Sequence, residues 1–554
     1  GFLIQLHRML HKRVTTENNS NSARKLGTYN MDEAMLNKTS LSPSQQQLNS
    51  LIEKFKNGRY DEAEKLAVLI TQQFPDHQFT WKILGVILGQ RGRKAEALNA
   101  NQKAVTLSPQ DAIAHNNLGT TLKELGKLEE AEVSLRQAIA LKPDYALAYN
   151  NLGSTLKELG KLEEAEVSYR KSINLKSDYA ESHNSLGSTL KELGKLEEAE
   201  VSLRQAIALK PDFLEAHNNL GFTLKELGRL EEAAVIYKQA IILKPDFAEA
   251  HNNLGGTLQE LNKLEEAEVS LRQAIVLKPD FAKAYLNLGN TLKNLGRLEE
   301  AEVSYRKSIK LKPDFADAHN NLGNTLNQVG RLEEAEACLR QAIILKPGFV
   351  EAHNNLGFTL KELGRLEEAA VIYKQAIILK PDFAEAHNNL GGTLQELNKL
   401  EEAEVSLRQA IVLKPDFAKA YLNLGNTLKN LGRLEEAEVS YRKSIKLKPD
   451  FADAHNNLGN TLNQVGRLEE AEACLRQAII LKPGFVEAHN NLGGTLQELN
   501  KLEEAEACLR QAIILKPDFA DAHNNLGKTL YIKGFEVSAL ESIEKANKIN
   551  PQSK

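Results

Sequence analysis

A row of asparagines recurs every 34 residues along most of the chain. Each asparagine side chain carries both hydrogen-bond donors and an acceptor. If each repeat is numbered so that the glycine of a recurring Asn-Leu-Gly motif is place eight, these asparagines occupy place six, and Ser185 interrupts the row. Such a row could hydrogen-bond both backbone groups of an extended polypeptide, with little dependence on its sequence. The row consists of Asn117, Asn151, Asn219, Asn253, Asn287, Asn321, Asn355, Asn389, Asn423, Asn457, Asn491 and Asn525.

Two alternatives to peptide binding stay open for this row. Asparagine is a poor residue for a helix interior, by about 0.7 kcal/mol relative to alanine, so keeping it in one row needs a reason. That reason could be solubility or hydrogen bonding between helices of the array. The row could also have been copied passively, since residues 215–357 are identical to residues 351–493.

Residues flanking the row predict the character of the face that it shares. Acidic residues dominate places two and thirteen, as at Glu215 and Glu260, although Lys283 and Lys419 depart from this pattern. An acidic face favours basic or neutral partners. Phe222 and Phe358, at place nine, are candidate apolar contact points, and packing between repeats is an equally good interpretation of them.

Other reactive residue types do not form a convincing catalytic or metal site. Ten histidines, from His115 to His523, share place four, but copies on successive helices lie too far apart to converge on one zinc ion. The Gly-Lys-Thr segment at Gly527 lacks the earlier glycine of a phosphate-binding loop. Three cysteines have no histidine-based partner. We therefore expect no catalytic residue, no metal and no cofactor.

The spacing of apolar residues predicts two helices per repeat. In residues 112–145, apolar residues recur at intervals of three and four, which places them on one face of each of two helices. Gly126 between them is a candidate for the residue that ends the first helix, and Pro143 ends the second. Gly119 and Ala131 are small residues expected where the two helices cross.

This pattern resembles the tetratricopeptide-repeat family, which places an aromatic residue, Leu-Gly, bulky residues, two alanines and a proline at fixed places in 34 residues. The corresponding residues are His115, Leu118, Gly119, Leu122, Ala131, Leu135, Ala138 and Pro143, and Trp81 supplies the family's tryptophan. The resemblance implies an all-α fold: an α-solenoid forming a right-handed superhelix of about fifteen hairpins, with the first helices on the concave side. We expect this array at residues 44–553, with degenerate, cap-like first and last repeats, and a disordered segment at residues 1–43.

The asparagine row is similar to the one in the repeat domain of O-GlcNAc transferases, where such a row holds extended substrate chains. The resemblance implies a non-catalytic scaffold that binds extended polypeptide segments in its concave groove. An alternative is the substrate-recruiting arm of such a glycosyltransferase, with a catalytic domain beyond Lys554, since the chain begins with glycine and ends soon after Pro551. Self-association through the array ends is a third hypothesis.

Composition narrows the class of partner and the compartment. The 70 Lys and Arg residues nearly balance 74 Asp and Glu residues, which gives no electrostatic reason to expect nucleic acid or a membrane surface. Three cysteines are typical of a reducing compartment, and the apolar runs are too short for a membrane span. We expect a cytoplasmic protein that binds other proteins or peptides.

Overall fold

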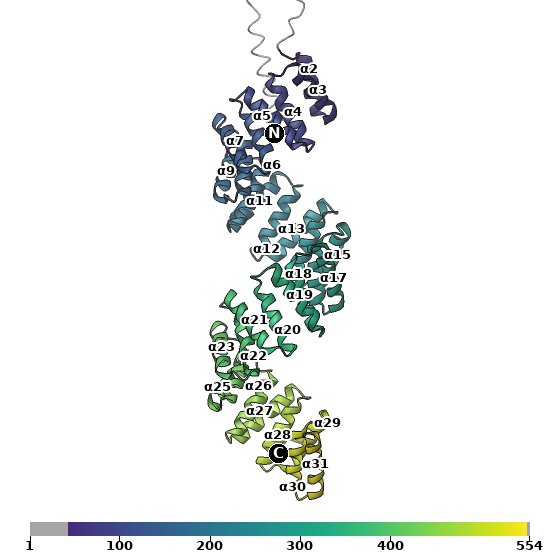
Figure 1. Ribbon diagram of the computed structural model, residues 1–554, viewed down its shortest axis with the longest axis vertical. Coiled ribbons are helices and arrows are strands. Elements are labelled where there is room, and N and C mark those ends of the chain that lie inside the picture. Colours follow the sequence, from purple (N-terminus) through teal and green to yellow (C-terminus); the bar gives the residue numbers. More distant parts are fainter. Residues whose placement is uncertain (1–41, 551–554) are drawn as a thin grey trace, which may run out of the picture. The chain divides into compact units, whose positions relative to one another are not determined.

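The computed structural model describes residues 42–550, in which every regular element is an α-helix (Figure 1). The thirty helices of this part pack as fifteen successive hairpins, so the expected all-α solenoid is confirmed. Most of the segment 1–43 that was expected to be disordered, and the last residues of the expected array, lie outside the described residues. Within residues 42–550, no helix combines the length and apolar character needed to cross a membrane.

The chain divides into two units at residues 279 and 280, and each unit is a run of hairpins. The N-terminal unit contains α2 (Gln45–Lys56), α3 (Tyr60–Gln73), α4 (Gln78–Gln90), α5 (Lys94–Leu107), α6 (Ala112–Glu124), α7 (Leu128–Leu141), α8 (Ala146–Glu158), α9 (Leu162–Leu175), α10 (Ala180–Glu192), α11 (Leu196–Leu209), α12 (Leu214–Glu226), α13 (Leu230–Leu243), α14 (Ala248–Glu260) and α15 (Leu264–Leu277). The C-terminal unit contains α16 (Ala282–Asn294), α17 (Leu298–Leu311), α18 (Ala316–Gln328), α19 (Leu332–Leu345), α20 (Val350–Glu362), α21 (Leu366–Leu379), α22 (Ala384–Glu396), α23 (Leu400–Leu413), α24 (Ala418–Asn430), α25 (Leu434–Leu447), α26 (Ala452–Gln464), α27 (Leu468–Leu481), α28 (Val486–Glu498), α29 (Leu502–Leu515), α30 (Ala520–Ile532) and α31 (Glu536–Ile549).

The turn inside each hairpin depends on one residue with left-handed backbone geometry. Gly126 has φ +75°, and the amide of Lys127 donates to the carbonyl of Leu122 at 2.9 Å, which ends the first helix. In three hairpins asparagine holds the same place, with φ between 56° and 58°: Asn262, Asn398 and Asn500. Glycine and asparagine are the residues that tolerate this geometry best. The prediction that Gly126 ends the first helix is confirmed.

The two helices of a hairpin cross where a glycine meets a large buried side chain. A Cβ atom added to Gly119 would lie 2.6 Å from Cγ of Leu135, which is fully buried. In other hairpins a tyrosine takes the place of this leucine, as Tyr441 does beneath Gly425. Ala131 is also fully buried. The small residues at this crossing therefore allow the close helix approach that their spacing predicted.

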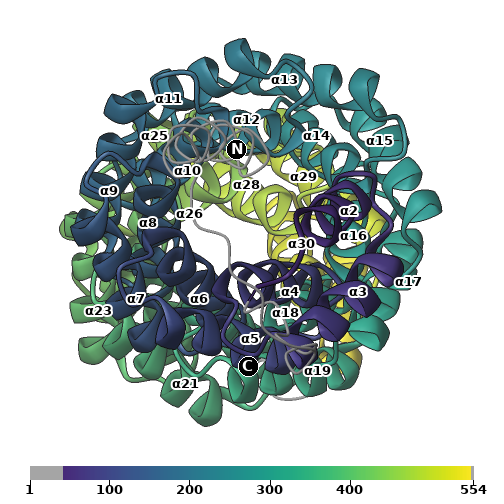
Figure 2. The same ribbon diagram turned by 90° about the horizontal axis from the view of Figure 1, so that it is seen from above.

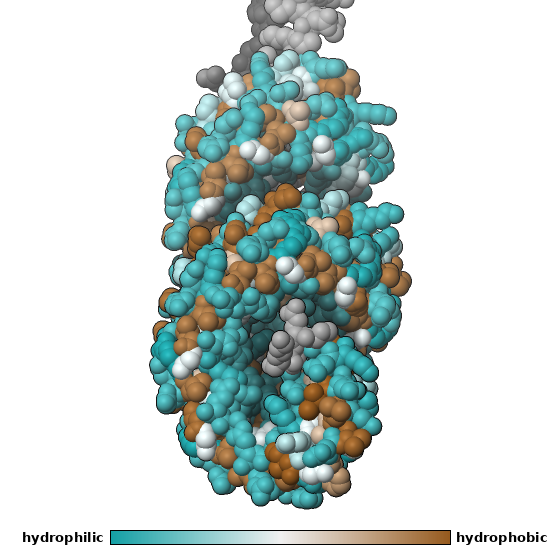
Figure 3. Space-filling model, turned by 60° about the horizontal axis from the view of Figure 1, so that its bottom comes forward, coloured by the Kyte–Doolittle hydropathy of each residue, from teal (hydrophilic) through white to brown (hydrophobic). Residues whose placement is uncertain are grey.

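Each unit has an inner face formed by the first, even-numbered helices and an outer face formed by the second, odd-numbered helices (Figure 2). Valines and isoleucines such as Val133 and Ile344 project from the outer helices and are about 70% exposed. Hydrophobic residues form separate patches on a mostly hydrophilic surface (Figure 3). Scattered apolar residues of this kind are normal on a protein surface.

A repeated set of ion pairs links the second helices of successive hairpins. The carboxylate of Glu132 accepts from Arg136 at 2.8 Å and from Lys161 of the next hairpin at 2.9 Å, and Arg136 also contacts Glu164 at 2.7 Å. The central glutamate recurs at Glu166, Glu200, Glu302, Glu336, Glu404, Glu438 and Glu472. Because each glutamate joins two hairpins, the outer face carries a network rather than isolated pairs.

Replacing Glu472 with glutamine is expected to lower the free energy of unfolding by about 0.5–1 kcal/mol at low ionic strength. Hydrogen bonds from Lys501 and Arg476 lower the pKa of this carboxyl, and a neutral amide loses both charge pairs. Denaturation at low and high salt measures the effect, which should shrink at high salt through screening. Glu541→Gln is the control, since Glu541 has no ion pair among residues 42–550. Equal losses in the two variants would contradict a role for the network.

Candidate peptide-binding face

The twelve asparagines of the row, called here the asparagine ladder, all lie on first helices, from Asn117 on α6 to Asn525 on α30. Every one of them is half-buried. The ladder therefore follows the inner face of each unit, and its side chains are not free in solvent.

Ladder amides donate hydrogen bonds to the preceding hairpin. The amide of Asn355 donates to the side-chain oxygen of Asn320 at 3.0 Å, and Asn423 donates to Asn388 at 2.9 Å. The acceptor is the asparagine at place five, the neighbour of the preceding ladder residue. The same bond, at 2.7–3.0 Å, is made by Asn151, Asn219, Asn253, Asn389, Asn491 and Asn525. One donor of each amide is thus used within the array.

Where leucine replaces asparagine at place five, the ladder finds another acceptor. Leu286 occupies that place before Asn321, and the amide of Asn321 donates to Asn290 at place nine, at 2.9 Å. The hydroxyl of Tyr305 donates to the same Asn290 oxygen at 2.8 Å. Asn457 and Asn426 repeat this arrangement at 2.8 Å. Hydrogen bonding to the previous hairpin is therefore kept where leucine replaces its usual partner.

The side-chain oxygens of the ladder differ in whether they accept a hydrogen bond within the array. The side-chain oxygens of Asn253, Asn321, Asn389 and Asn457 accept from the neighbouring place-five amide at 3.0–3.2 Å. At Asn355, Asn423 and Asn491, no described residue donates to this oxygen. The bond through one N–H fixes the plane of each amide. An oxygen or a second N–H is then left for another molecule.

Cavities on the inner face are lined by ladder residues. In the C-terminal unit, Asn389 and Asn423 line a cavity of about 310 Å³, and Asn491 and Asn525 line another of about 200 Å³. In the N-terminal unit, a cavity of about 490 Å³, called here the N-terminal cavity, is lined by residues that include Asn117. The ladder thus borders space that a bound chain could occupy.

The inner face is less acidic than the glutamates and aspartates at places two and thirteen led us to expect. Place twelve of several first helices is lysine, and its ammonium contacts the place-thirteen glutamate of the next hairpin, as Lys225 does with Glu260 at 2.7 Å. The pairs of Lys157 with Glu192 and Lys361 with Glu396 are alike, at 2.8 Å. Burial lowers the pKa of a lysine at the same place, Lys429, whose ammonium donates to Asn460. The expected acidic face is therefore partly neutralised by its own lysines.

Two phenylalanines at place nine are substantially exposed on the inner face. Phe222 is 39% exposed, and the ammonium of Lys191 lies 4.4 Å from the centre of its ring. Phe358 is 44% exposed and lines the cavity beside Asn389 and Asn423. The exposure leaves part of both rings accessible as apolar contact points, and Phe222 also packs against the preceding hairpin through Lys191.

The histidines and cysteines have surroundings that favour a structural role over catalysis or metal binding. A ring nitrogen of His251 hydrogen-bonds the carbonyl oxygen of Pro245 at 3.1 Å, as the indole nitrogen of Trp81 does with Pro75 at 2.7 Å. Within residues 42–550, no group of three His, Cys, Asp or Glu side chains is placed to hold a metal ion. Burial raises the pKa of the thiols of Cys338, Cys474 and Cys508, which disfavours the reactive thiolate.

Family models recognise these hairpins along nearly the whole described part. Models of the tetratricopeptide repeat match residues 51–112, 100–133, 120–160, 153–194, 452–485 and 495–534. The model of the cilia and flagella-associated protein 70 C-terminal domain matches two overlapping stretches, 177–388 and 262–461. The chain belongs to the tetratricopeptide-repeat family. No curated protein matches this tetratricopeptide-repeat chain.

The solved structure of one other protein supports the same fold along most of the chain. The crystal structure of the APC/C hetero-tetramer Cut9-Hcn1 is 15% identical with a TM-score of 0.50, and the alignment covers 86% of this chain and 94% of that one. YrrB, described as a tetratricopeptide-repeat protein with an unusual peptide-binding site, is 27% identical with a TM-score of 0.29 over 33% of this chain and 93% of its own. MamA is 22% identical with a TM-score of 0.28, over 29% of this chain and 95% of its own. The tetratricopeptide-repeat fold is generally that of a non-catalytic protein-interaction scaffold.

The structure adds residues that reasoning from the tetratricopeptide-repeat pattern overlooked. Asparagines at place five accept from the ladder, and lysines at place twelve neutralise the inner face. Their signal was in the sequence, since both places recur every 34 residues. A single repeat does not reveal them, because each acts on the next hairpin of the tetratricopeptide-repeat array.

Proposed function

We propose that this chain is a protein-interaction scaffold that binds extended polypeptide segments along its inner face, through the asparagine ladder. The observation that supports the proposal best is the fixed orientation of the ladder amides. Asn355, Asn389 and Asn423, like most members of the ladder, are each tied to the preceding hairpin through one N–H, so little side-chain freedom is left to lose when a polypeptide binds. The remaining amide groups match the alternating N–H and C=O groups of an extended backbone.

The same hydrogen bonds also stabilise contacts between hairpins, and the test has to separate the two roles. Three consecutive ladder residues of the C-terminal unit, Asn355, Asn389 and Asn423, are replaced by alanine in one variant. A matched control replaces their acceptors, Asn320, Asn354 and Asn388, by alanine. Both variants lose the same three hydrogen bonds between hairpins, but only the first loses the ladder amides.

We expect the ladder variant to bind a fluorescent, randomised peptide library about tenfold or more weakly than the unaltered chain, since a hydrogen bond contributes about 1 kcal/mol net. The acceptor variant should keep most of the affinity, although both variants should unfold at a similarly lowered temperature. Binding is measured by fluorescence anisotropy. Equal loss of affinity in the two variants would leave the ladder with a role between hairpins only.

A second readout tests whether the peptide backbone is what the ladder binds. Methylation of the peptide nitrogens removes backbone donors and leaves the side chains unchanged. We expect N-methylated peptides to bind less tightly than their parents, and exchange of side chains to matter less. Affinity that follows side chains and ignores N-methylation would contradict backbone recognition.

A further inference from the structure

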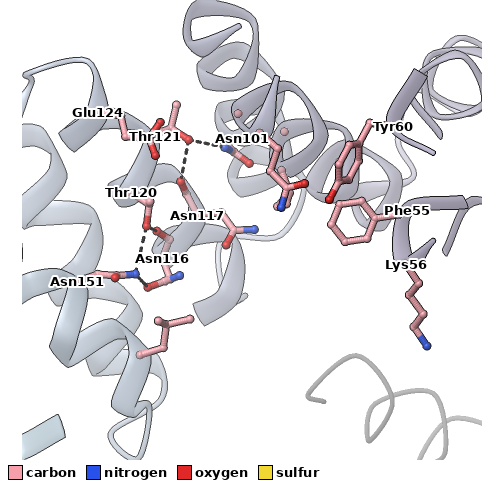
Figure 4. Close-up of a pocket in the computed structure, with 15 residues that line it drawn as sticks. Phe55, Lys56, Tyr60, Asn101, Asn116, Asn117, Thr120, Thr121, Glu124 and Asn151 are labelled. Carbon is pink, nitrogen blue, oxygen red and sulfur yellow. Dashed lines mark hydrogen bonds between the residues drawn. The ribbon is translucent and has the colours of Figure 1, made fainter. Parts of the chain in front are cut away.

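The N-terminal cavity differs from the other inner-face cavities because it contains polar atoms without partners. It is lined by α2, α3, α4, α5, α6 and α8, all within the N-terminal unit. Figure 4 shows Asn101 on α5 and Asn117 on α6 along its polar side, with Phe55 and Tyr60 on the other side. The two aromatic rings meet edge to face, with centres 5.9 Å apart.

Asn101 is a buried polar residue at a place that other hairpins fill with leucine or tyrosine, such as Leu135 and Tyr169. It is 1% exposed. Its amide donates to the hydroxyl of Thr121 at 2.9 Å, but its side-chain oxygen is buried and has no partner among residues 42–550. Burying an acceptor without a hydrogen bond is costly, and such atoms are uncommon in native proteins.

Asn117 is the ladder residue whose amide nitrogen is left buried and without a partner in the described part. The reason is a substitution in the preceding hairpin, where Lys82 replaces the place-five asparagine that would accept from it. The ammonium of Lys82 contacts the carboxylate of Asp111 at 2.6 Å and offers no acceptor. Thr121 connects the two unpartnered groups, because it accepts from Asn101 and donates to the main-chain oxygen of Asn117 at 3.0 Å.

The cavity stays open because α4 carries glycine where most first helices carry a longer residue. Gly89 occupies place twelve, which is Lys123 on α6 and Gln259 on α14. A Cβ atom at Gly89 would meet nothing within 4 Å. A long side chain at this place would therefore enter the cavity without disturbing the packing of α4.

We propose that the N-terminal cavity binds the carboxamide side chain of a glutamine or asparagine residue in the bound polypeptide. Both atoms are buried, and the Asn101 oxygen packs against Gly85, so the two side chains turn toward the cavity when a carboxamide binds. The carboxamide then accepts from the Asn117 amide and donates to the Asn101 oxygen, which satisfies both unpartnered atoms. The methylene groups leading to it lie against Phe55 and Tyr60. The cavity is then an anchor for one residue of the segment that the ladder holds, and this inference rests on the proposed function.

The same atoms discriminate against charged relatives of glutamine. A glutamate carboxylate only accepts, so it would face the Asn101 oxygen without a donor to offer. A lysine ammonium only donates and would face the Asn117 amide. Leaving buried partners unpaired is what makes a polar site selective against close analogues. Methionine fills similar space, but its sulfur is only a weak acceptor for the Asn117 amide and offers no donor to the Asn101 oxygen.

The test compares four capped peptides of alanine and serine with a single central Gln, Glu, Lys or Met, each titrated into the full chain. We expect the Gln peptide to bind about tenfold more tightly than the other three. Two variants should remove this preference. Asn101→Leu installs the residue found at the same place in other hairpins, and Gly89→Gln fills the cavity while leaving Asn101 and Asn117 in place.

The controls separate failure of this inference from failure of the proposed function. Unchanged thermal unfolding of Gly89→Gln excludes misfolding as the cause of a lost preference. A ladder variant of the same unit, with alanine at Asn219 and Asn253, should weaken all four peptides and keep their ranking. Equal binding of the four peptides, or a Gln preference that survives both variants, overturns the anchor and leaves the ladder standing. No binding of any peptide overturns both.

Discussion

Replacing Asp111 with asparagine is expected to destabilise the N-terminal hairpins by about 3–5 kcal/mol, because it leaves a buried ammonium without its counter-charge. Lys82 is 4% exposed, and its ammonium lies 2.6 Å from the Asp111 carboxylate. The ring of Phe79 also lies near this ammonium, with its centre 5.8 Å away. Asparagine keeps the acceptor that caps α6, where Asp111 accepts from the amide of Ile113 at 2.8 Å. The loss therefore comes from the charge and from the second carboxylate oxygen, which accepts from Lys82 and Gln78 and is replaced by an amide donor.

Removing the other member of the pair, by Lys82→Met, should cost less stability, about 1–3 kcal/mol. Asp111 would still accept from the side chain of Gln78 at 2.7 Å and from the amides that begin α6, where a negative charge is favoured. The double variant should recover most of the stability, since a buried ion pair can be replaced by uncharged groups at little cost. Trp81 is the single tryptophan of the chain and adjoins Lys82, so its fluorescence reports unfolding of these hairpins.

Lowering the pH should remove the stabilisation that the ion pair of Lys82 and Asp111 provides. Burial alone would raise the pKa of Asp111, but the charge of Lys82 and hydrogen bonds from Lys82 and Gln78 lower it below its ordinary value of 3.8. The stabilisation is then complete above that value and is lost as the pH falls through the lowered pKa. The difference in unfolding free energy between the unaltered chain and Asp111→Asn should stay constant down to about pH 4 and shrink below it. A smaller loss for Asp111→Asn than for Lys82→Met would contradict this account of the pair.

Features that repeat within one hairpin could be predicted from the sequence. Gly126 ends the first helix and Gly119 allows the helices to cross, because both requirements arise inside 34 residues. The spacing of leucines, alanines and prolines was enough to predict the number of hairpins and their helices. The place of the ladder on the first helix followed from the same periodicity, and its use in binding stays a proposal.

Features that depend on two hairpins, or on one exceptional residue, could not be read from the repeat. The partner of Asn321 changed to Asn290 because Leu286 replaced an asparagine in the hairpin before it. Asn101 and Lys82 are departures from the pattern that stand out only when the cavity and its unpartnered atoms are seen. A repeating sequence describes its average unit well, and the structure shows what single departures from it do.

Gly493 and Gly494 are neighbours on α28, and substitution of each by alanine is expected to change stability in opposite directions. A Cβ atom at Gly493 would lie 2.5 Å from Cγ and 2.7 Å from Cδ2 of Leu509. Leu509 is fully buried, so it has little room to move. We expect Gly493→Ala to lower the free energy of unfolding by about 1–3 kcal/mol, the usual cost of overpacking a core.

Gly494→Ala is the matched control, because a Cβ atom there would meet nothing within 4 Å. Alanine is favoured over glycine inside a helix by about 0.5–1 kcal/mol, so this variant should be more stable than the unaltered chain. Both substitutions, at adjacent positions, reduce the conformational freedom of the unfolded backbone by the same amount. The difference between them therefore measures the contact with Leu509 alone.

Hydrogen exchange of the α28 and α29 amides is the appropriate measurement, because hairpins of a repeat array open locally. Protection should fall in Gly493→Ala and rise in Gly494→Ala. Adding Leu509→Ala removes the atoms that the new Cβ meets, so the loss in the double variant should be smaller than the sum of the two single losses. Strict additivity would mean that Leu509 is not what requires glycine at Gly493. Because the same close contact recurs beneath Gly119 and Gly425, that outcome would also remove the reason why the helices of each hairpin cross at a glycine.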